Sequence, residues 1–174
     1  MRLIRRAGLA VSPWPNGAGR KADILAGPGW LIGFAFLDAD APFSDYAGHD
    51  RTITLLDGPG FSLVGGDALT VDVPHVPTPF DGGWRVRCRI HGGPCVVLNA
   101  VTERARWRHR VTIGPVPANA DPGDAVADVL VVLAGEVGAG NRLAGRHDAL
   151  CLDAQADLHA STDALVCRIS VRPT

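Results

Sequence analysis

Several common sequence patterns are missing from this 174-residue chain. No apolar run approaches the roughly 18 residues that a membrane-spanning helix needs. The first residues are interrupted by charge and by Pro13 and Pro15, unlike a signal peptide. The net charge is −1, so bulk attraction to nucleic acid or to an anionic membrane is not expected. We therefore expect a soluble, cytoplasmic protein with no nucleic-acid partner and no membrane partner.

The usual signatures of metal and catalytic chemistry are also absent. The sequence has no His-x-His, no C-x-x-C, no G-x-S-x-G and no H-E-x-x-H. Its 6 histidines are isolated in turn-like contexts, and its 4 cysteines lie in apolar runs typical of buried free thiols. We therefore predict no bound metal, no cofactor and no catalytic residue.

Helical periodicity is almost absent, whereas short apolar segments separated by turn residues are frequent. The 21 glycines and 13 prolines punctuate these segments, as in an all-β chain with many turns. Strands are predicted at 30–37, 51–56, 60–64, 68–73, 84–90, 94–99, 107–113, 128–134, 149–153 and 164–171. Short strands at this spacing indicate a sandwich or a barrel.

An internal repeat narrows this choice. "TLLDG" (54–58) is followed by "GDALTVD" (66–72), and "VVLAG" (131–135) is followed by "HDALCLD" (147–153), so that Asp-Ala-Leu begins at both Asp67 and Asp148. This order predicts two copies of one β-hairpin module. We predict an all-β double-stranded β-helix (cupin or jelly roll), a two-lobed bicupin. Residues 1–174 form one unit, with lobes at about 1–113 and 114–174.

Four blocks in the first two thirds of the chain carry a family resemblance. In order, they are "WPNGAGRKADI" (14–24), "APFSDYAGHDRTITLLDGPGFSL" (41–63), "PFDGGW" (79–84) and "GGPCVVLNAVTERARW" (92–107). They resemble successive motifs of the HutD/Ves family, although Pro15 replaces a family lysine and Val97 a family aspartate. The resemblance implies a bacterial cytoplasmic bicupin without established enzyme activity. It also implies a regulator of histidine utilisation that senses a small carboxylate such as formylglutamate or urocanate.

Three polar residues at matching positions are embedded in apolar or glycine contexts. Arg51 opens "RTITLL", Asn99 ends "PCVVLN", and Asn16 precedes Gly17. A buried polar side chain is costly unless it has a partner, so such residues hold backbone or bind a ligand. Arg51 is the candidate that binds a carboxylate, because its planar guanidinium offers two charge-assisted hydrogen bonds. Asn16 and Asn99 are predicted to orient the ligand.

The remaining candidates form the surroundings of the same pocket. Trp14 and Phe43 are predicted as apolar walls, and Thr102 as a weaker polar addition. The glycines after Asn16 are expected to turn the backbone tightly into a strand at Ile24 and Leu25, so that Asn16 and Trp14 point inward. Structural explanations stay open at three positions: Asn16 in a turn, Arg51 in an ion pair with Asp50, and Asn99 as a tie between a strand end and a loop.

Two other functions remain as alternatives. A metal-free cupin enzyme, an isomerase or hydrolase acting on a small carboxylate, would need His49, Asp50 or Glu103 as its acid or base. An interaction module would instead use arginines at period two, which strands would place on one face. These arginines are Arg85, Arg87 and Arg89 in one segment and Arg104, Arg106, Arg108 and Arg110 in another. A homodimer is also left open.

Overall fold

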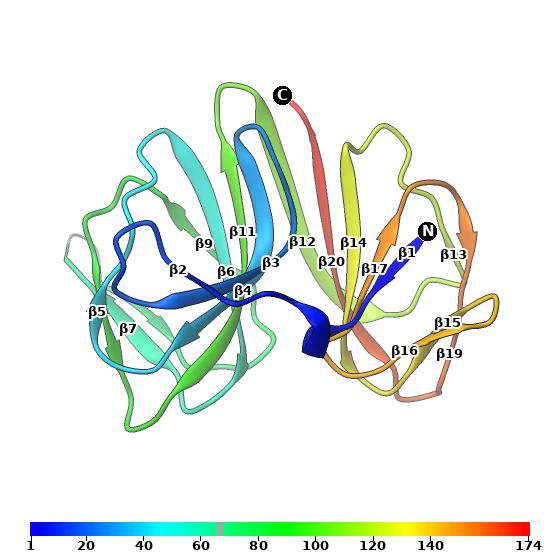
Figure 1. Ribbon diagram of the computed structural model, residues 1–174, viewed down its shortest axis with the longest axis horizontal. Helices are drawn as coiled ribbons and strands as arrows, with labels where there is room; N and C mark the ends of the chain where they lie inside the picture. Colours follow the sequence, from blue (N-terminus) through cyan, green and yellow to red (C-terminus); the bar gives the residue numbers. More distant parts are fainter. Residues whose placement is uncertain (66–67) are drawn as a thin grey trace. The chain divides into compact units, whose positions relative to one another are not determined.

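The computed structural model describes residues 1–65 and 68–174, almost all of them in β-strands and turns (Figure 1). A 3-10 turn, η1 (Arg6–Gly8), is the only helical element in this part of the chain. Among these residues we find no helix long and apolar enough to cross a membrane. The contacts divide the chain into unit 1, made of Met1–Leu9 and Trp107–Thr174, and unit 2, made of Ala10–Arg106.

Unit 2 contains a larger and a smaller antiparallel sheet. The strand order of the larger sheet is β2 (Ser12–Pro13), β3 (Arg20–Gly27), β4 (Trp30–Leu37), β11 (Cys95–Glu103), β6 (His49–Asp57) and β9 (Thr78–Asp81). The order of the smaller sheet is β5 (Ala41–Pro42), β10 (Arg87–Ile90), β7 (Phe61–Val64) and β8 (Leu69–Val71). Because β11 lies between β4 and β6, the larger sheet joins segments far apart in the sequence.

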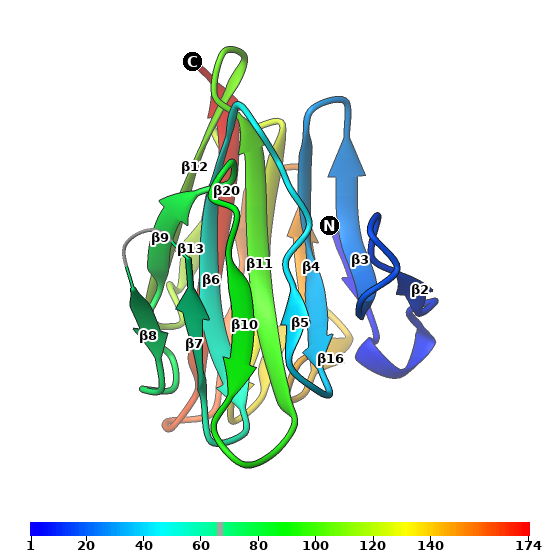
Figure 2. The ribbon, with the colours of Figure 1, turned by 90° about the vertical axis from the view of Figure 1, so that its left-hand side faces the viewer.

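The core of unit 2 lies between these two sheets. In Figure 2, β10, β7 and β5 of the smaller sheet overlie β6, β11 and β4 of the larger one. Phe61 and Leu63 from β7 are fully buried in one cluster with Leu55 from β6 and Val97 from β11. Burial of apolar side chains at this interface is the main stabilising contribution to unit 2.

Unit 1 is built around a five-stranded antiparallel sheet. Its order is β1 (Arg2–Ile4), β17 (Ala149–Leu152), β14 (Ala127–Ala134), β20 (Leu165–Pro173) and β12 (Trp107–Pro115). Two small sheets complete the unit: β16 (Arg142–Ala144), β15 (Val137–Ala139) and β19 (His159–Ala160) form one, and β13 (Asn119–Ala120) and β18 (Ala156–Asp157) form the other. The pairing of β1 with β17 places the N-terminal residues in this unit.

The predicted all-β architecture is confirmed, and every predicted strand coincides with an observed one, although several ends differ. The segment predicted at 84–90, for example, begins its strand only at Arg87. Residues 66–67, which include Asp67 of the predicted repeat, lie outside the described residues. In β6, both faces are buried from Arg51 to Leu56, so Arg51, Thr52 and Thr54 are buried together with the apolar residues of this strand.

The arginine-rich segments are only partly in strands. Arg87 and Arg89 are exposed on β10, whereas Arg85 precedes that strand. Arg104 and Arg106 lie in the turn before β12. The second arginine segment therefore does not place all of its arginines on one strand face.

Candidate functional site

Unit 2 contains a cavity against the inner face of its larger sheet. Strands β3, β4, β6 and β11 contribute to it, together with the segment that follows β5. The empty space is about 420 Å³, part of which is open to solvent. The space that can hold the centres of water-sized molecules is about 30 Å³, so the enclosed part of the cavity is small in this structure. The cavity has apolar walls that include Trp14, Phe43 and Ile53, and its polar lining residues are Lys21, Asp23, Ser44, Tyr46, Arg51 and Asn99.

The strand register explains why residues from four strands meet there. Ile53 on β6 pairs with Asn99 on β11, Asn99 pairs with Gly33 on β4, and Gly33 pairs with Asp23 on β3. Residues opposite each other in a sheet share a face, and residues two apart on a strand share it as well. Arg51, two residues before Ile53, therefore lies on the same face as this row.

Arg51 is the most deeply buried charged group of the cavity. Only 5% of the residue is exposed. The guanidinium carbon lies 5.1 Å from the ring centroid of Phe43, 5.2 Å from that of Tyr46 and 4.8 Å from that of Phe80. Its Nε is buried without a hydrogen-bond partner, and no carboxylate among the described residues forms an ion pair with it. Aromatic faces thus replace part of the lost hydration of the cation.

The environment of Arg51 changes its acidity without removing its charge. Burial lowers the pKa of the Arg51 guanidinium to about 10, and the Tyr46 phenol opposes this shift. A group with this pKa remains protonated at neutral pH. Unit 2 therefore holds a buried, uncompensated positive charge beside a cavity, an arrangement that favours an anionic ligand.

The other cavity residues include an ion pair and further unpartnered polar atoms. The Lys21 Nζ donates to Asp23 Oδ2 at 2.6 Å, so these two charges compensate each other. Asp23 Oδ1, Ser44 Oγ and Asn99 Oδ1 are each buried without a hydrogen-bond partner. Because unpartnered buried polar atoms are rare in folded proteins, their grouping around one cavity makes this cavity the candidate functional site.

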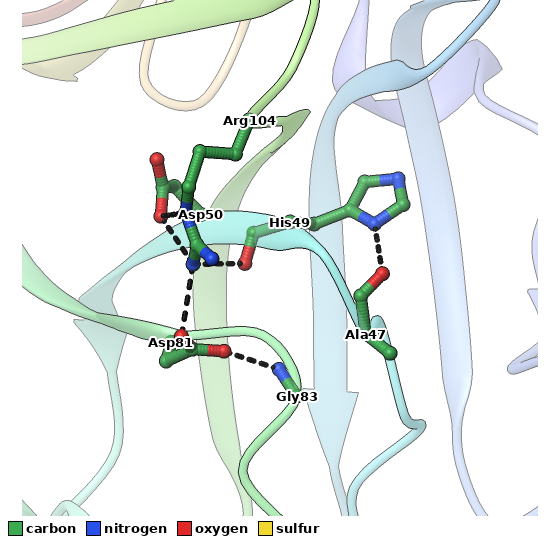
Figure 3. Close-up of polar contacts among 6 residues, drawn as sticks. All are labelled: Ala47, His49, Asp50, Asp81, Gly83 and Arg104. Atoms are coloured by element: carbon green, nitrogen blue, oxygen red, sulfur yellow. Dashed lines mark hydrogen bonds and ion pairs between the residues drawn. The ribbon is translucent and has the colours of Figure 1, made fainter.

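Figure 3 shows a hydrogen-bond network at the start of β6, around Asp50, Asp81 and Arg104. Arg104 donates from Nε to Asp50 Oδ1 at 2.8 Å and from Nη2 to Asp81 Oδ2 at 2.9 Å. Asp81 also accepts from the Gly83 N–H at 2.7 Å. This N–H and the Arg104 guanidinium hold the pKa of Asp81 below its ordinary value. The network links β6 to the end of β9, the strand that carries Phe80.

The loop that carries Tyr46 is attached to the same region. The Tyr46 N–H donates to Gly82 O at 2.9 Å, the Gly82 N–H to His49 O at 2.8 Å, and the His49 N–H to Tyr46 O at 3.0 Å. The His49 Nδ1 lies 3.0 Å from Ala47 O. Two of the three rings around Arg51, those of Tyr46 and Phe80, are therefore positioned by backbone bonds and by Arg104.

Four of the six predicted site residues line the cavity: Trp14, Phe43, Arg51 and Asn99. Asn16 is exposed and does not line the cavity. Its Nδ2 donates to Pro42 O at 2.9 Å, and its Oδ1 accepts from the Ala18 N–H at 3.0 Å. Thr102 is buried on β11, three residues beyond Asn99 and hence on the other face of the strand. The ligand-binding function of all six residues stays a prediction.

The structure also adds site residues that the sequence prediction lacked. Lys21 and Asp23 lie on β3, which contains the strand expected at Ile24 and Leu25 but begins earlier, at Arg20. Ser44 and Tyr46 lie in a loop. The signal for the first two was their spacing of two residues, which places both on one strand face. No comparable sequence signal marks Ser44 or Tyr46.

The residues considered for acid–base catalysis have other contacts. Asp50 accepts from Arg104, and Glu103 forms an ion pair with Arg106 at 3.4 Å. His49, Asp50 and Glu103 are not among the lining residues of the cavity. Within the described residues, no three His, Cys, Asp or Glu side chains form a group that could hold a metal ion. The residues present therefore do not fit the metal site typical of many cupins.

The fold and the cavity together define the class of protein, a cupin-fold protein with a buried arginine in one β unit. A cupin 2 conserved barrel domain protein from Leptotrichia buccalis shares the fold, with a TM-score of 0.61 and 11% identity over 98% of this chain and 91% of that one. Within this class, residues 6–167 match the HutD family model, and the chain belongs to the HutD family.

Similar proteins come from several bacteria. HutD from Pseudomonas fluorescens SBW25 has a TM-score of 0.81 and 26% identity, covering 99% of this chain and 98% of that one. An uncharacterised 21.2 kDa protein in the hutC 3' region of Pseudomonas putida is 31% identical over 119 residues (64% of this chain), and Protein Ves of Cronobacter sakazakii is 32% identical over 112 residues (60%). These alignments span 63% and 62% of the two relatives, less than two thirds of their length.

Proposed function

We propose that this protein binds a small carboxylate through Arg51 and acts as a non-enzymatic regulator of histidine utilisation. The observation that supports the proposal most directly is the buried Arg51 guanidinium, which borders a cavity, carries a charge at neutral pH and has an unpartnered Nε. Leaving a buried charge uncompensated costs several kcal/mol, by order of magnitude. Binding of an anion would remove much of that cost.

A carboxylate is the anion that suits this site. Its two oxygens can accept parallel hydrogen bonds from the guanidinium fork, and such charge-assisted bonds are among the strongest in proteins. Trp14, Phe43 and Ile53 offer apolar surface to the rest of the molecule. Formylglutamate and urocanate, the ligands implied by the family resemblance, are both small carboxylates.

The regulatory part of the proposal rests on the relatives. The chain belongs to the HutD family, and the Pseudomonas putida relative is named for its position in the hutC 3' region. Protein binding to a pathway intermediate without turnover would allow the cell to sense the level of that intermediate. Both parts of this statement, ligand binding and absence of turnover, are accessible to direct measurement.

The binding test uses titration calorimetry with acetate, urocanate and N-formylglutamate on the purified chain and on Arg51→Met. Methionine has a similar length and packs against aromatic rings, but it has no charge. We expect the variant to lose about 10- to 100-fold in affinity for any acid that binds the unmodified chain. Arg87→Met, at an exposed position on β10, is the matched control and should bind as the unmodified chain does.

Undiminished carboxylate binding by Arg51→Met would contradict the assignment of Arg51. A thermal-shift screen of the same acids provides an independent readout, because a ligand that binds only the folded state raises its melting temperature. Prolonged incubation of the protein with each bound acid, followed by chromatography, tests for turnover. Formation of a product that scales with protein concentration would favour the metal-free cupin enzyme instead.

A further inference from the structure

Unit 1 has a polar groove that the proposed function does not use. It lies on the sheet face that also carries Leu130 and Val166 of the apolar core of this unit. The space in it that can hold the centres of water-sized molecules is about 520 Å³. The lining residues are Arg110, Thr112, Asp121, Arg168, Ser170 and Arg172. Five of these six side chains offer hydrogen-bond donors, so the groove suits a ligand rich in acceptors.

The strand register gathers arginines from β12 and β20 on one face. The opposed positions are Arg108 with Arg172, Arg110 with Ser170, and Thr112 with Arg168. Residues opposite each other, and residues two apart on one strand, share a face of the sheet. Ser170 is therefore flanked by Arg168 and Arg172 along its own strand and by Arg110 across the pair. The second arginine segment of the sequence thus contributes Arg108 and Arg110 to this face.

This face places like charges next to one another. Arg108 and Arg172 are directly opposite, and like charges in this position destabilise a sheet. Arg108 and Arg110 are exposed, and neither side chain has a hydrogen-bond or ion-pair partner among the described residues. A bound anion would reduce the repulsion, whereas the chain itself leaves these two arginines uncompensated.

The other two arginines are held in place by contacts within unit 1. Arg168 donates from Nη2 to the main-chain oxygen of Asp121 at 2.7 Å and forms an ion pair with Asp128. The hydrogen bonds to the Asp128 carboxylate raise the pKa of the Arg168 guanidinium, so it stays charged. Arg172 forms an ion pair with Asp124. The Arg168 Nη1 takes part in none of these contacts and remains a donor for a ligand.

The loop after β13 contributes the one acidic residue of the lining. Asp121 Oδ1 accepts from the Gly123 N–H at 2.8 Å, so this carboxylate stabilises the turn of the loop. The aspartates beside the four arginines are Asp121, Asp124 and Asp128. One positive charge therefore remains uncompensated on this face, which favours a ligand with negative charge.

From this arrangement we infer that the groove of unit 1 binds a phosphate group, with Arg110 as its principal cation. A phosphate has oxygens on several sides. It can accept from the Arg110 guanidinium, from the hydroxyls of Ser170 and Thr112 and from Arg168 at the same time, whereas a carboxylate has only two oxygens. Free phosphate and a phosphate monoester share this chemistry. The inference is independent of the proposed function, because no residue of unit 2 takes part.

The test is titration calorimetry with inorganic phosphate and with glycerol 3-phosphate on the purified chain. Arg110→Met removes the principal cation, and we expect a loss of about tenfold in affinity for both ligands. Arg108→Met is the matched control. It removes the same charge from the same face of the same strand, but Arg108 does not line the groove. Because a charge outside the groove is screened by salt, this variant should lose no more than about twofold.

Two further variants test the rest of the site. Ser170→Ala removes the central hydroxyl and should reduce phosphate affinity by about threefold. Arg51→Met should bind phosphate as the unmodified chain does, since the cavity of unit 2 is not involved. In Arg51→Met, formate should bind about tenfold more weakly than phosphate, because it offers fewer acceptors. Melting temperatures verify that each variant is folded.

The outcomes decide whether the groove is a site. Tighter binding of glycerol 3-phosphate than of phosphate supports the inference with a monoester as the ligand, and the reverse order supports it with free phosphate. Equal losses in Arg108→Met and Arg110→Met would indicate a diffuse surface charge and overturn it. Absence of saturable binding by both phosphates, or loss of that binding in Arg51→Met, would overturn it as well. Formate binding as tight as that of phosphate would contradict the assignment to phosphate.

Discussion

At the scale of single residues, the contact between Trp14 and Gly19 determines one wall of the cavity. The Trp14 N–H donates to Gly19 O at 2.8 Å, and the indole Nε1 donates to Arg20 O at 2.8 Å. A Cβ atom at Gly19 would lie 2.6 Å from the indole ring, so the ring rests directly on the glycine backbone. From there its ring centroid lies 5.4 Å from that of Phe43, in an edge-to-face arrangement.

Gly19→Ala should therefore destabilise the protein and displace Trp14. Because the clash is with a rigid ring, we expect a loss of about 1–3 kcal/mol in the free energy of unfolding, as for other overpacked sites. Urea denaturation measures this loss, and Trp fluorescence reports the displaced ring. Gly114→Ala is the control, since a Cβ atom there would have no neighbour within 4 Å. Equal stability of the two variants would contradict the proposed contact.

The site residues differ in how well their sequence context predicts them. Arg51 and Asn99 interrupt or end apolar runs, and both line the cavity. Asn16 before Gly17 fits a turn and a site equally well, and only its bonds to Pro42 and Ala18 show that it holds the turn. Which face of β11 a residue occupies depends on the register with the neighbouring strands, which the sequence of β11 alone does not specify.

At the scale of secondary structure, the bounds of strands with many β-branched or aromatic residues can be predicted more fully than those of β3, of which the sequence indicates only the part around Ile24 and Leu25. The sequence of β3, "RKADILAG", contains several residues that are depleted in strands. It is a strand because it pairs with β4 over most of its length, from Arg20–Phe36 to Gly27–Trp30. Lys21 and Asp23 lie in the first part of β3, and their position in the site depends on that pairing, which the sequence of β3 does not indicate.

In unit 1, Asp148 lies in the loop between β16 and β17 and connects this loop to the residues around η1. Its carboxylate accepts from Arg5 Nη1 at 2.6 Å, from the Arg6 N–H at 2.9 Å and from the Gly145 N–H at 3.1 Å. Burial would raise the pKa of Asp148, but these three bonds together hold it below its ordinary value. The carboxylate thereby attaches η1 and the residue preceding it to the loop between these strands.

Because the pKa of Asp148 is lowered in the folded state, its ionised form stabilises the protein. Asp148→Asn should reduce the free energy of unfolding by about 1–3 kcal/mol at pH 7. The difference from the unmodified chain should shrink as the pH falls below 3.8, the ordinary carboxyl value, and through the lowered pKa. Urea denaturation at several pH values provides the measurement, with the exposed Asp157→Asn as control. A difference that does not depend on pH would contradict this account.

At the scale of the whole molecule, the two units have the same strand register at one place, but different residues occupy the equivalent positions. In unit 2, Arg51 pairs with Val101 and Ile53 pairs with Asn99. In unit 1, Asp128 pairs with Ser170 and Leu130 pairs with Arg168, with the same spacing. The repeat of "TLLDG" in "VVLAG" aligns Arg51 with Asp128. The strand pairing, and not the repeat, makes Asn99 correspond to Arg168. The sequence therefore predicts the first equivalence only, and it does not predict what occupies the space between these positions.

In unit 1 the side chains of Asp128 and Arg168 bind each other and fill this space. Arg168 donates from Nε to Asp128 Oδ1 at 3.0 Å and from Nη2 to Asp128 Oδ2 at 2.6 Å. The Asp128 side chain is fully buried. In unit 2 the corresponding pair is Arg51 and Asn99, and both have an unpartnered atom facing the cavity. Asp128 thus supplies to Arg168 the carboxylate that, under the proposed function, a ligand supplies to Arg51.

If this correspondence is correct, removing the internal carboxylate should turn unit 1 into an anion-binding unit. Asp128→Ala leaves Arg168 without its acid and creates space beside it. We expect a loss of about 3 kcal/mol in the free energy of unfolding, toward the lower end for a broken buried ion pair because Arg168 is 30% exposed. Formate should restore part of this stability, since its carboxylate can take the place of the removed side chain.

The measurement is the melting temperature of Asp128→Ala and of the unmodified chain in formate and in chloride at equal ionic strength. Arg51→Met is introduced into both proteins so that formate binding in unit 2 does not contribute. Asp163→Ala, which removes an exposed acid from the same unit, controls for the change in net charge. A formate-specific increase that is confined to the Asp128→Ala protein supports the correspondence. Equal effects of formate and chloride would show that Arg168 alone does not provide a carboxylate site.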